Sequence, residues 1–183
     1  MKLSIILSLF ILLGGAPMVR AQEIPEMPKP VKEHEWLKQL EGEWESEMEV
    51  HMPGADTPVK GKGTETGRML GGFWLIADGN GEMMGMKMSS RFTLGYDPDA
   101  KKYTGTWVDS MGSYLWKYEG SVDSTGKILT LNTEGPCPMK PGKSKFKEVI
   151  EIKDKDTKIF TSSMQGDDGK WTLMVKVTSK RKK

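Results

Sequence analysis

The chain has 183 residues, with 27 lysines and arginines against 25 aspartates and glutamates. Without residues 1–21, which carry Lys2 and Arg20 and no acid, basic and acidic residues number 25 each, so the remainder is formally neutral. Because a protein that binds a phosphate backbone concentrates basic residues on one face, this balance argues against a nucleic-acid partner.

The N-terminus has the pattern of a secretory signal peptide. Lys2 provides a short positive region, residues 3–13 form an apolar run, and Val19-Arg20-Ala21 offers small or compact residues to a signal peptidase. The apolar run is short for a permanent membrane span. We therefore predict export to the periplasm or outside the cell, cleavage after Ala21, and no transmembrane anchor in the mature form. An uncleaved, membrane-tethered N-terminus is the alternative.

A single folded domain is predicted over residues 32–183, preceded by a linker. Residues 22–31 contain three prolines and few bulky apolar groups, which is typical of an extended linker. Trp36 and Leu40 then recur at helical spacing among charged residues, which predicts one short amphipathic helix over residues 31–41.

Strand patterns follow the helix as far as the C-terminus. Residues 43–52 place Trp44, Ser46, Met48, Val50 and Met52 on one face and four glutamates and His51 on the other. Further strands are predicted at 59–69, 72–79, 84–96, 101–110, 113–121, 126–134, 145–153, 157–164 and 170–179. The predicted fold class is all-β, an antiparallel meander of about ten strands closed into a barrel, because closure removes exposed edges. A two-sheet sandwich is the alternative.

The C-terminal part carries the single cysteine and the one basic cluster. Because Cys137 is the single cysteine, it cannot form an intramolecular disulfide. Its turn-rich setting without a nearby histidine predicts an inert thiol. Residues 180–183, Lys-Arg-Lys-Lys, are predicted to form a solvated tail that ends the last strand.

Several motifs resemble known barrel proteins. Residues 37–44, a short helix running into Gly-x-Trp, resemble the opening of calycin barrels, the lipocalin and fatty-acid-binding-protein superfamily. Later motifs, taken in order, resemble an uncharacterised bacterial family, domain of unknown function 1579 (DUF1579): Gly71-Gly72-Phe73-Trp74, Gly95-Tyr96-Asp97-Pro98, Gly105-Thr106-Trp107-Val108-Asp109-Ser110, the segment 129–136, and Gly169-Lys170-Trp171. The resemblance extends from about His34 to Arg181. It implies a calycin-like or lipocalin-like barrel and no known activity, so no catalytic residue is carried over.

A barrel of this kind can enclose a cavity whose inward residues select a ligand. Glu148 is a candidate because Phe146, Ile150 and Ile152 share its face of a predicted strand, and a buried carboxylate needs a partner or a raised pKa. A position at the barrel mouth, or a different register, is the alternative for Glu148. The candidate ligand-binding residues are Trp74, Met88, Tyr103, Trp107, Trp116 and Glu148. Core packing is the competing interpretation of the aromatic residues.

The sequence predicts no cofactor and no metal. Methionines at 83, 84, 86 and 88 suit Cu(I), but alternate methionines also fill one face of a strand. His34 and His51 lie on different predicted elements without a Cys-x-x-Cys companion, which argues against zinc. Some related ten-strand barrels hold haem through a histidine near the C-terminus, and this chain has none after His51. The aspartate-rich segments are predicted to be turns and not calcium sites.

The predicted function is non-catalytic binding of a small, largely apolar molecule inside a secreted barrel. One alternative is an envelope structural or interaction protein, which predicts a packed barrel and an apolar patch outside it. The other is a hydrolase or isomerase, which predicts that Glu148 or Asp109 has a second titratable group within hydrogen-bond reach. The sequence contains no nucleophile elbow, phosphate-binding loop or His-Glu-x-x-His.

Overall fold

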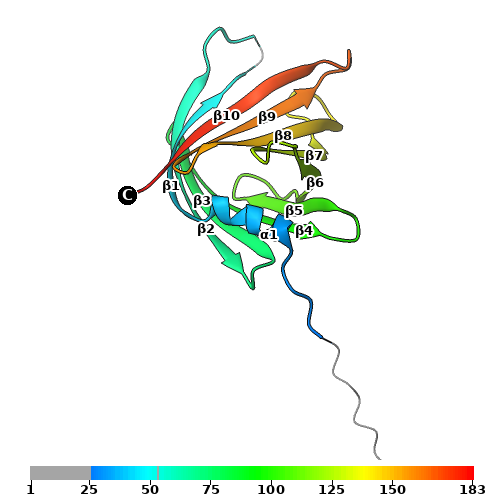
Figure 1. The fold of residues 1–183 in the computed structure, drawn as a ribbon. Coiled ribbons are helices and arrows are strands. Elements are labelled where there is room, and N and C mark those ends of the chain that lie inside the picture. The colour runs from blue at the N-terminus through cyan, green and yellow to red at the C-terminus, as the bar shows by residue number, and fades with distance from the viewer. Residues whose placement is uncertain (1–25, 53) are drawn as a thin grey trace, which may run out of the picture.

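A computed structural model describes residues 26–52 and 54–183 of the chain (Figure 1). It contains α1 (Lys32–Leu37), the 3-10 helix η1 (Lys38–Leu40), β1 (Gly42–Val50), β2 (Val59–Leu70), β3 (Trp74–Met83), β4 (Met86–Asp97), β5 (Lys102–Asp109), β6 (Trp116–Val122), β7 (Ile128–Pro136), β8 (Lys143–Asp154), β9 (Thr157–Gln165) and β10 (Trp171–Arg181). Each strand pairs antiparallel with its neighbours in sequence, and β10 pairs with β1. The predicted all-β meander, closed into a ten-strand barrel with one short helix, is confirmed, and the sandwich alternative is wrong.

The predicted signal peptide, residues 1–21, lies outside the described residues, as do the first four residues of the predicted linker. No helix within the described ranges is long and apolar enough to cross a membrane.

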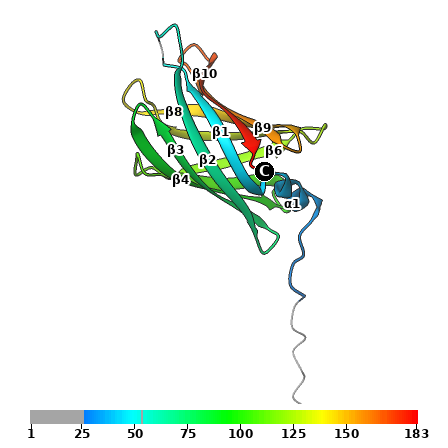
Figure 2. The ribbon, with the colours of Figure 1, turned by 90° about the vertical axis from the view of Figure 1, so that its left-hand side faces the viewer.

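Side chains alternate between the lumen and the outer surface along each strand. In β1, Trp44 is buried, whereas Glu43 and Glu45 beside it are exposed, as the alternation in the sequence predicts. The short helices lie across one end of the barrel, next to the end of β10 (Figure 2). We call this the helix end. The loops that follow β1, β3, β5, β7 and β9 lie at the other end, which we call the open end.

The hairpin between β3 and β4 differs from the prediction. Gly79-Asn80-Gly81 has the composition of a turn, yet it lies within β3 and pairs with β2 on one side and β4 on the other. The turn comes later, at Met84 and Gly85, whose φ angles are 53° and 75°. The methionine-rich stretch is therefore mostly paired strand, and pairing on both sides outweighs the local turn preference of the glycines.

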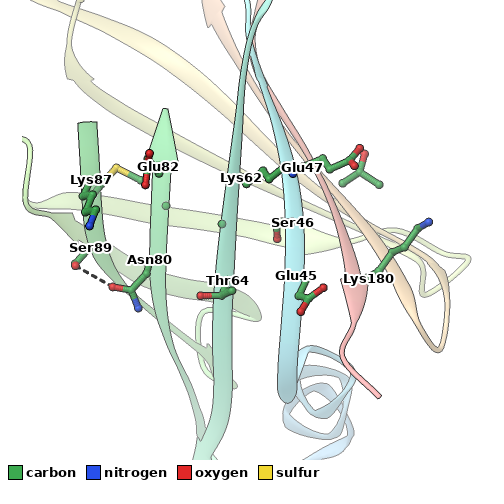
Figure 3. A pocket seen from close by; sticks show the side chains of 14 residues that line it. Glu45, Ser46, Glu47, Lys62, Thr64, Asn80, Glu82, Lys87, Ser89 and Lys180 are labelled. Atoms are coloured by element: carbon green, nitrogen blue, oxygen red, sulfur yellow. Dashed lines mark hydrogen bonds between the residues drawn. The ribbon is translucent and has the colours of Figure 1, made fainter. Parts of the chain in front are cut away.

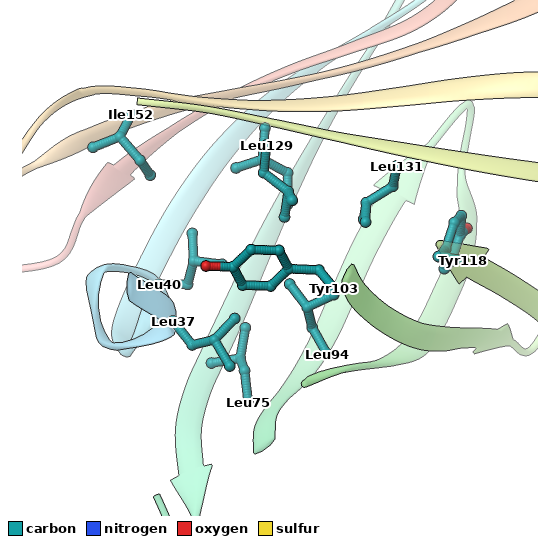
Figure 4. Packing of buried hydrophobic residues seen from close by; sticks show 10 residues of the cluster. Leu37, Leu40, Leu75, Leu94, Tyr103, Tyr118, Leu129, Leu131 and Ile152 are labelled. Atoms are coloured by element: carbon teal, nitrogen blue, oxygen red, sulfur yellow. The ribbon is translucent and has the colours of Figure 1, made fainter. Parts of the chain in front are cut away.

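A leucine core fills the helix end of the lumen. The Tyr103 ring lies among leucines from the short helices and from β3, β4 and β7 (Figure 4), namely Leu37, Leu40, Leu75, Leu94 and Leu129, each at most 1% exposed. The Tyr103 hydroxyl donates to the Glu33 carbonyl of α1 at 3.0 Å, and Trp36 Nε1 donates to the Gly126 carbonyl at 2.7 Å. Burial raises the pKa of Tyr103, which keeps this hydroxyl a donor. Apolar burial and these two bonds hold the helix in the barrel end.

Closure of the barrel explains the Gly-x-Trp motif. The Arg181 guanidinium lies 4.2 Å over the Trp44 ring and donates to the Glu41 carbonyl, while Trp44 Nε1 donates to the Leu40 carbonyl at 3.2 Å. Gly42 has φ +103°, and a Cβ there would collide with the guanidinium. Arg181 is thus part of β10 and of the closure, so the prediction of a solvated tail beginning at residue 180 is wrong for this residue.

Candidate functional site

A cluster of polar and aromatic side chains lines the lumen between the leucine core and the open end. Cross-strand pairing brings its members together, with Trp107 opposite Trp116, and Glu148 opposite both Leu131 and Ser162. We call this the inner-wall cluster, and its members are Trp107, Trp116, Tyr118, Thr133, Phe146, Glu148 and Ser162. They come from five consecutive strands, β5 to β9, so the pairing of neighbouring strands assembles them.

Glu148 provides the carboxylate of the cluster and is buried. Its side chain faces the lumen between Phe146 and Ile150, as predicted, and the residue is 6% exposed. Oε1 accepts a hydrogen bond from the Ser162 hydroxyl at 3.0 Å, whereas Oε2 is buried and has no partner within the described residues. Burial raises the pKa of Glu148 to about 7, and the Ser162 hydrogen bond opposes this rise. Near neutral pH the carboxyl is therefore present in both protonation states.

Thr133, like Glu148, has a buried polar atom that lacks a hydrogen-bond partner within the described residues. Its Oγ1 is buried on β7 without a hydrogen-bond partner in the described chain, and the residue pairs with Phe146 on β8. An unpaired buried polar group costs on the order of 1–3 kcal/mol. Sequence analysis missed Thr133, although it alternates with Leu129 and Leu131 on the buried face of β7.

Packing fixes the aromatic members in place. The Trp116 ring lies over Gly135, where a Cβ would overlap it, and meets Phe146 edge to face with centroids 5.2 Å apart. Trp107 Nε1 donates to the Asp109 carboxylate at 3.0 Å. The aromatic surface is thus preorganised before any ligand binds.

Burial and the charges of two carboxylates, Glu148 and Asp109, affect the pKa of the Tyr118 hydroxyl. Burial raises the pKa of Tyr118, and the charges of Glu148 and Asp109 raise it further. The phenol therefore stays protonated across the physiological range and remains a hydrogen-bond donor in the lumen.

The predicted ligand-binding residues fall into four places. Trp107, Trp116 and Glu148 belong to the inner-wall cluster. Met88 faces the lumen from β4 nearer the open end, where its methyl group and that of Met48 both approach Gly81. Tyr103 belongs to the leucine core. Trp74 lies on the outer wall over Gly95 and is 41% exposed, so it takes no part in the lumen.

Shallow polar grooves mark the outer surface. The larger, about 690 Å³, crosses β10, β1, β2, β3 and β4 (Figure 3). Its outward side chains are Glu45, Glu47, Lys62, Thr64, Asn80, Glu82, Lys87, Ser89, Thr178 and Lys180. None of them is buried, and three glutamates offset three lysines. Because solvated groups of balanced charge need no ligand, we assign the candidate site to the inner-wall cluster.

The two histidines and the cysteine lie apart from one another. His34 lies at the helix end, where its Nδ1 accepts a hydrogen bond from the Val31 amide at 3.0 Å, while His51 follows β1 at the open end. Cys137 is a free thiol whose Sγ lies 3.8 Å from Met164 Sδ, and hydrogen bonding with Ser144 lowers its pKa. In residues 26–52 and 54–183, no three His, Cys, Asp or Glu side chains converge as metal ligands.

A family described as "Protein of unknown function (DUF1579)" matches residues 29–181. The chain belongs to this family. The DUF1579 chain is similar to the crystal structure of Rv2717c from M. tuberculosis, with 14% identity, a TM-score of 0.64, and coverage of 85% of this chain and 100% of that chain. It is also similar to EF1p2_mFAP2b bound to DFHBI, with 11% identity, a TM-score of 0.40, and coverage of 81% and 98%. No curated protein matches. At its identity, the likeness to Rv2717c shows the barrel fold alone.

Replacing Thr133 in the DUF1579 protein tests whether its hydroxyl is unpaired. We expect Thr133→Val to raise the free energy of unfolding by about 1 kcal/mol, because valine fills the same space without a buried polar atom. Urea denaturation measures the change. The matched control is Thr106→Val, which removes a hydroxyl that lies 2.7 Å from Thr93 Oγ1 and should lower stability. A loss of stability for Thr133→Val would show that its hydroxyl is already satisfied.

Proposed function

We propose that this protein binds a small, largely apolar molecule in the lumen of the barrel, and that the molecule carries a hydrogen-bond-donating group that Glu148 receives. The observation that supports the proposal is the pair of buried atoms without partners, Glu148 Oε2 and Thr133 Oγ1, on adjacent strands of an aromatic wall. Folded proteins rarely leave such atoms unpaired, and apolar pockets with a few convergent polar groups are typical ligand sites.

The surroundings of Glu148 indicate the chemistry of the ligand. A carboxylate oxygen accepts hydrogen bonds from an amine, an alcohol or an amide, and the Thr133 hydroxyl adds a group that donates or accepts. The rings of Trp107 and Trp116 favour a flat apolar body or a cation beside it. We therefore infer a ligand with an apolar body and one amine, hydroxyl or amide end.

The open end provides the route of entry in this proposal. Met48, Met88 and Trp116 face the lumen and are partly exposed, whereas the leucines at the helix end are sealed. A ligand that enters at the open end, between Met48, Met88 and Trp116, reaches Glu148 before it meets the leucine core.

Binding is better supported than hydrolysis or isomerisation. Glu148 is hydrogen-bonded by Ser162, and the Asp109 carboxylate accepts from Trp107 and from the Met111 amide. Within the described residues, neither carboxylate is hydrogen-bonded to a second titratable side chain, as an acid-base pair requires.

We also propose that the protein acts after export, in the periplasm or outside the cell, because residues 1–21 have the pattern of a cleaved signal peptide. Native mass spectrometry of protein purified from its own cells tests both proposals. We expect a chain that begins at Gln22 and carries an added mass that denaturation removes. A chain that still begins at Met1 would contradict cleavage.

A fluorescence titration locates the binding site. N-phenyl-1-naphthylamine has an apolar body and one N–H donor, and diphenylhexatriene lacks the donor. We expect Glu148→Leu to weaken binding of the first probe about ten-fold or more and to leave the second unchanged, because a hydrogen bond to a charged group contributes about 1.5–3 kcal/mol. Glu134→Leu, on the exposed face of β7, is the matched control. Equal affinities in both variants would place the site elsewhere, and no uptake of either probe would contradict the carrier function.

A further inference from the structure

The loops at the open end of the barrel share one property. Large apolar side chains that are exposed to solvent stand at this end: Met52, Met84, Met111, Leu115 and Met139 in four of the five connections, and Trp171 as the first residue of β10, from 40% exposed for Trp171 to 72% for Met84. Because barrel topology brings these loops to one end, the side chains surround the mouth of the lumen. We call this set the apolar rim.

The helix end lacks such a ring. Leu70 and Trp74 flank one turn there, while the other three turns, at residues 98–101, 123–127 and 155–156, expose no large apolar side chain in the structure described. Each of those three turns carries charge, whereas the rim loops at 84–85 and 110–115 carry none. The concentration of exposed apolar side chains thus distinguishes the open end from the helix end.

Lysines stand beside the rim on the side built by β6 to β10. The lysines of this side outnumber its acids, Glu134, Asp167 and Asp168, and they are Lys117, Lys140, Lys143, Lys145, Lys147 and Lys170. Lys140 forms an ion pair with Asp167, and Lys170 forms one with Asp168. Two of these lysines lie over aromatic rings, with Lys147 Nζ 4.6 Å from the centre of the Trp171 ring and Lys143 Nζ 5.6 Å from that of Tyr114. Aromatic rings with adjacent lysines suit the interface of a bilayer, where rings lie at headgroup depth and ammonium groups meet phosphates.

We propose that the apolar rim docks on the surface of an anionic lipid bilayer, with the open end toward the lipid. The apolar side chains stand on four separate loops and at the start of β10, around the mouth of the lumen, so they offer no continuous face of the kind that a protein partner packs against. A bilayer accepts isolated apolar side chains, and the excess of lysines complements anionic headgroups. Docking does not depend on the proposed lumen ligand, but it places the lumen mouth where apolar molecules are dissolved.

Vesicle flotation with the chain that begins at Gln22 tests the proposal. We expect binding to phosphatidylcholine vesicles that contain about 30% phosphatidylglycerol, and weaker binding to pure phosphatidylcholine or at high salt. The double variant Met111→Ser/Leu115→Ser should lower the bound fraction about five-fold, because both side chains stand on one uncharged rim loop. Lys143→Gln/Lys145→Gln should reduce only the part of binding that depends on anionic lipid.

The matched control is Leu70→Ser, at the helix end, where the side chain is 55% exposed. It should bind vesicles like the unaltered protein. Absence of binding to anionic vesicles, or equal losses in Leu70→Ser and Met111→Ser/Leu115→Ser, would overturn the proposal. Light scattering provides a further test. A dimer of the unaltered protein that becomes a monomer in Met111→Ser/Leu115→Ser would assign the rim to a second copy of the chain and would also overturn the proposal. The rim variant should still take up N-phenyl-1-naphthylamine, so failure of docking is distinguishable from failure of the lumen site.

Discussion

Stability should fall on the order of 3 kcal/mol as pH rises from about 4.5 to 8, through Glu148 alone, because its pKa is about 7 in the folded state against an ordinary 4.5. A raised folded pKa means that the folded state holds the proton more tightly than the unfolded chain. The stabilisation is therefore complete below the unfolded pKa and is lost as pH rises through the folded pKa. Above that value, the native protein carries a buried charge with one unpaired oxygen.

Glu148→Gln isolates this effect. Glutamine has nearly the shape of the protonated carboxyl and does not ionise, so the variant should match the unaltered protein at pH 4 to 5 and exceed its unfolding free energy by up to about 3 kcal/mol at pH 8. Urea denaturation at several pH values measures both curves. Glu134→Gln on the exposed face of β7 is the control and should retain the pH dependence. If Glu148→Gln also retained it, Glu148 would ionise freely and the lumen wall would be wet.

The sequence predicted those features that depend on alternation within one strand. Trp44 among glutamates in β1, and Glu148 between Phe146 and Ile150 in β8, show which face is buried without reference to any other strand. Trp107 and Trp116 were predicted as ligand-binding residues on separate strands, and the pairing of β5 with β6 brings them opposite each other.

Features that depend on a neighbouring strand escaped prediction. Trp74 lies on the outer wall because Gly95, its partner on β4, leaves room for the ring, and nothing near residue 74 shows this. Thr133 resembles any strand threonine until Phe146 and the lumen surround it. The strand through Gly79-Asn80-Gly81 likewise depends on pairing with β2 and β4, which a local turn preference does not reveal.

Arg181, the third residue from the end of this 183-residue chain, should contribute about 3 kcal/mol to stability. Its guanidinium donates to the carbonyls of Glu41, Gln39 and Lys155, and it stacks on Trp44. Gln39 lies in η1 and Glu41 is its C-cap, so the arginine satisfies carbonyl acceptors in the last turn of this short helix. Its side chain is 31% exposed, which reduces the contribution of each charged hydrogen bond below that of a fully buried one.

We expect Arg181→Ala to lower the free energy of unfolding by about 3 kcal/mol, measured by urea denaturation. The variant loses the hydrogen bonds that join β10 to the Glu41 carbonyl after the short helices and to the Lys155 carbonyl between β8 and β9. Arg181→Lys should recover little, since a single ammonium cannot reach three carbonyls while it covers a ring. Lys180→Ala alters an exposed residue on the outer face of the same strand and should change stability by less than about 0.5 kcal/mol. Equal effects of Arg181→Ala and Lys180→Ala would contradict a role for the guanidinium in closing the barrel. A selective loss of stability at Arg181 would mean that the last strand holds the short helices in place at the helix end, next to the leucine core.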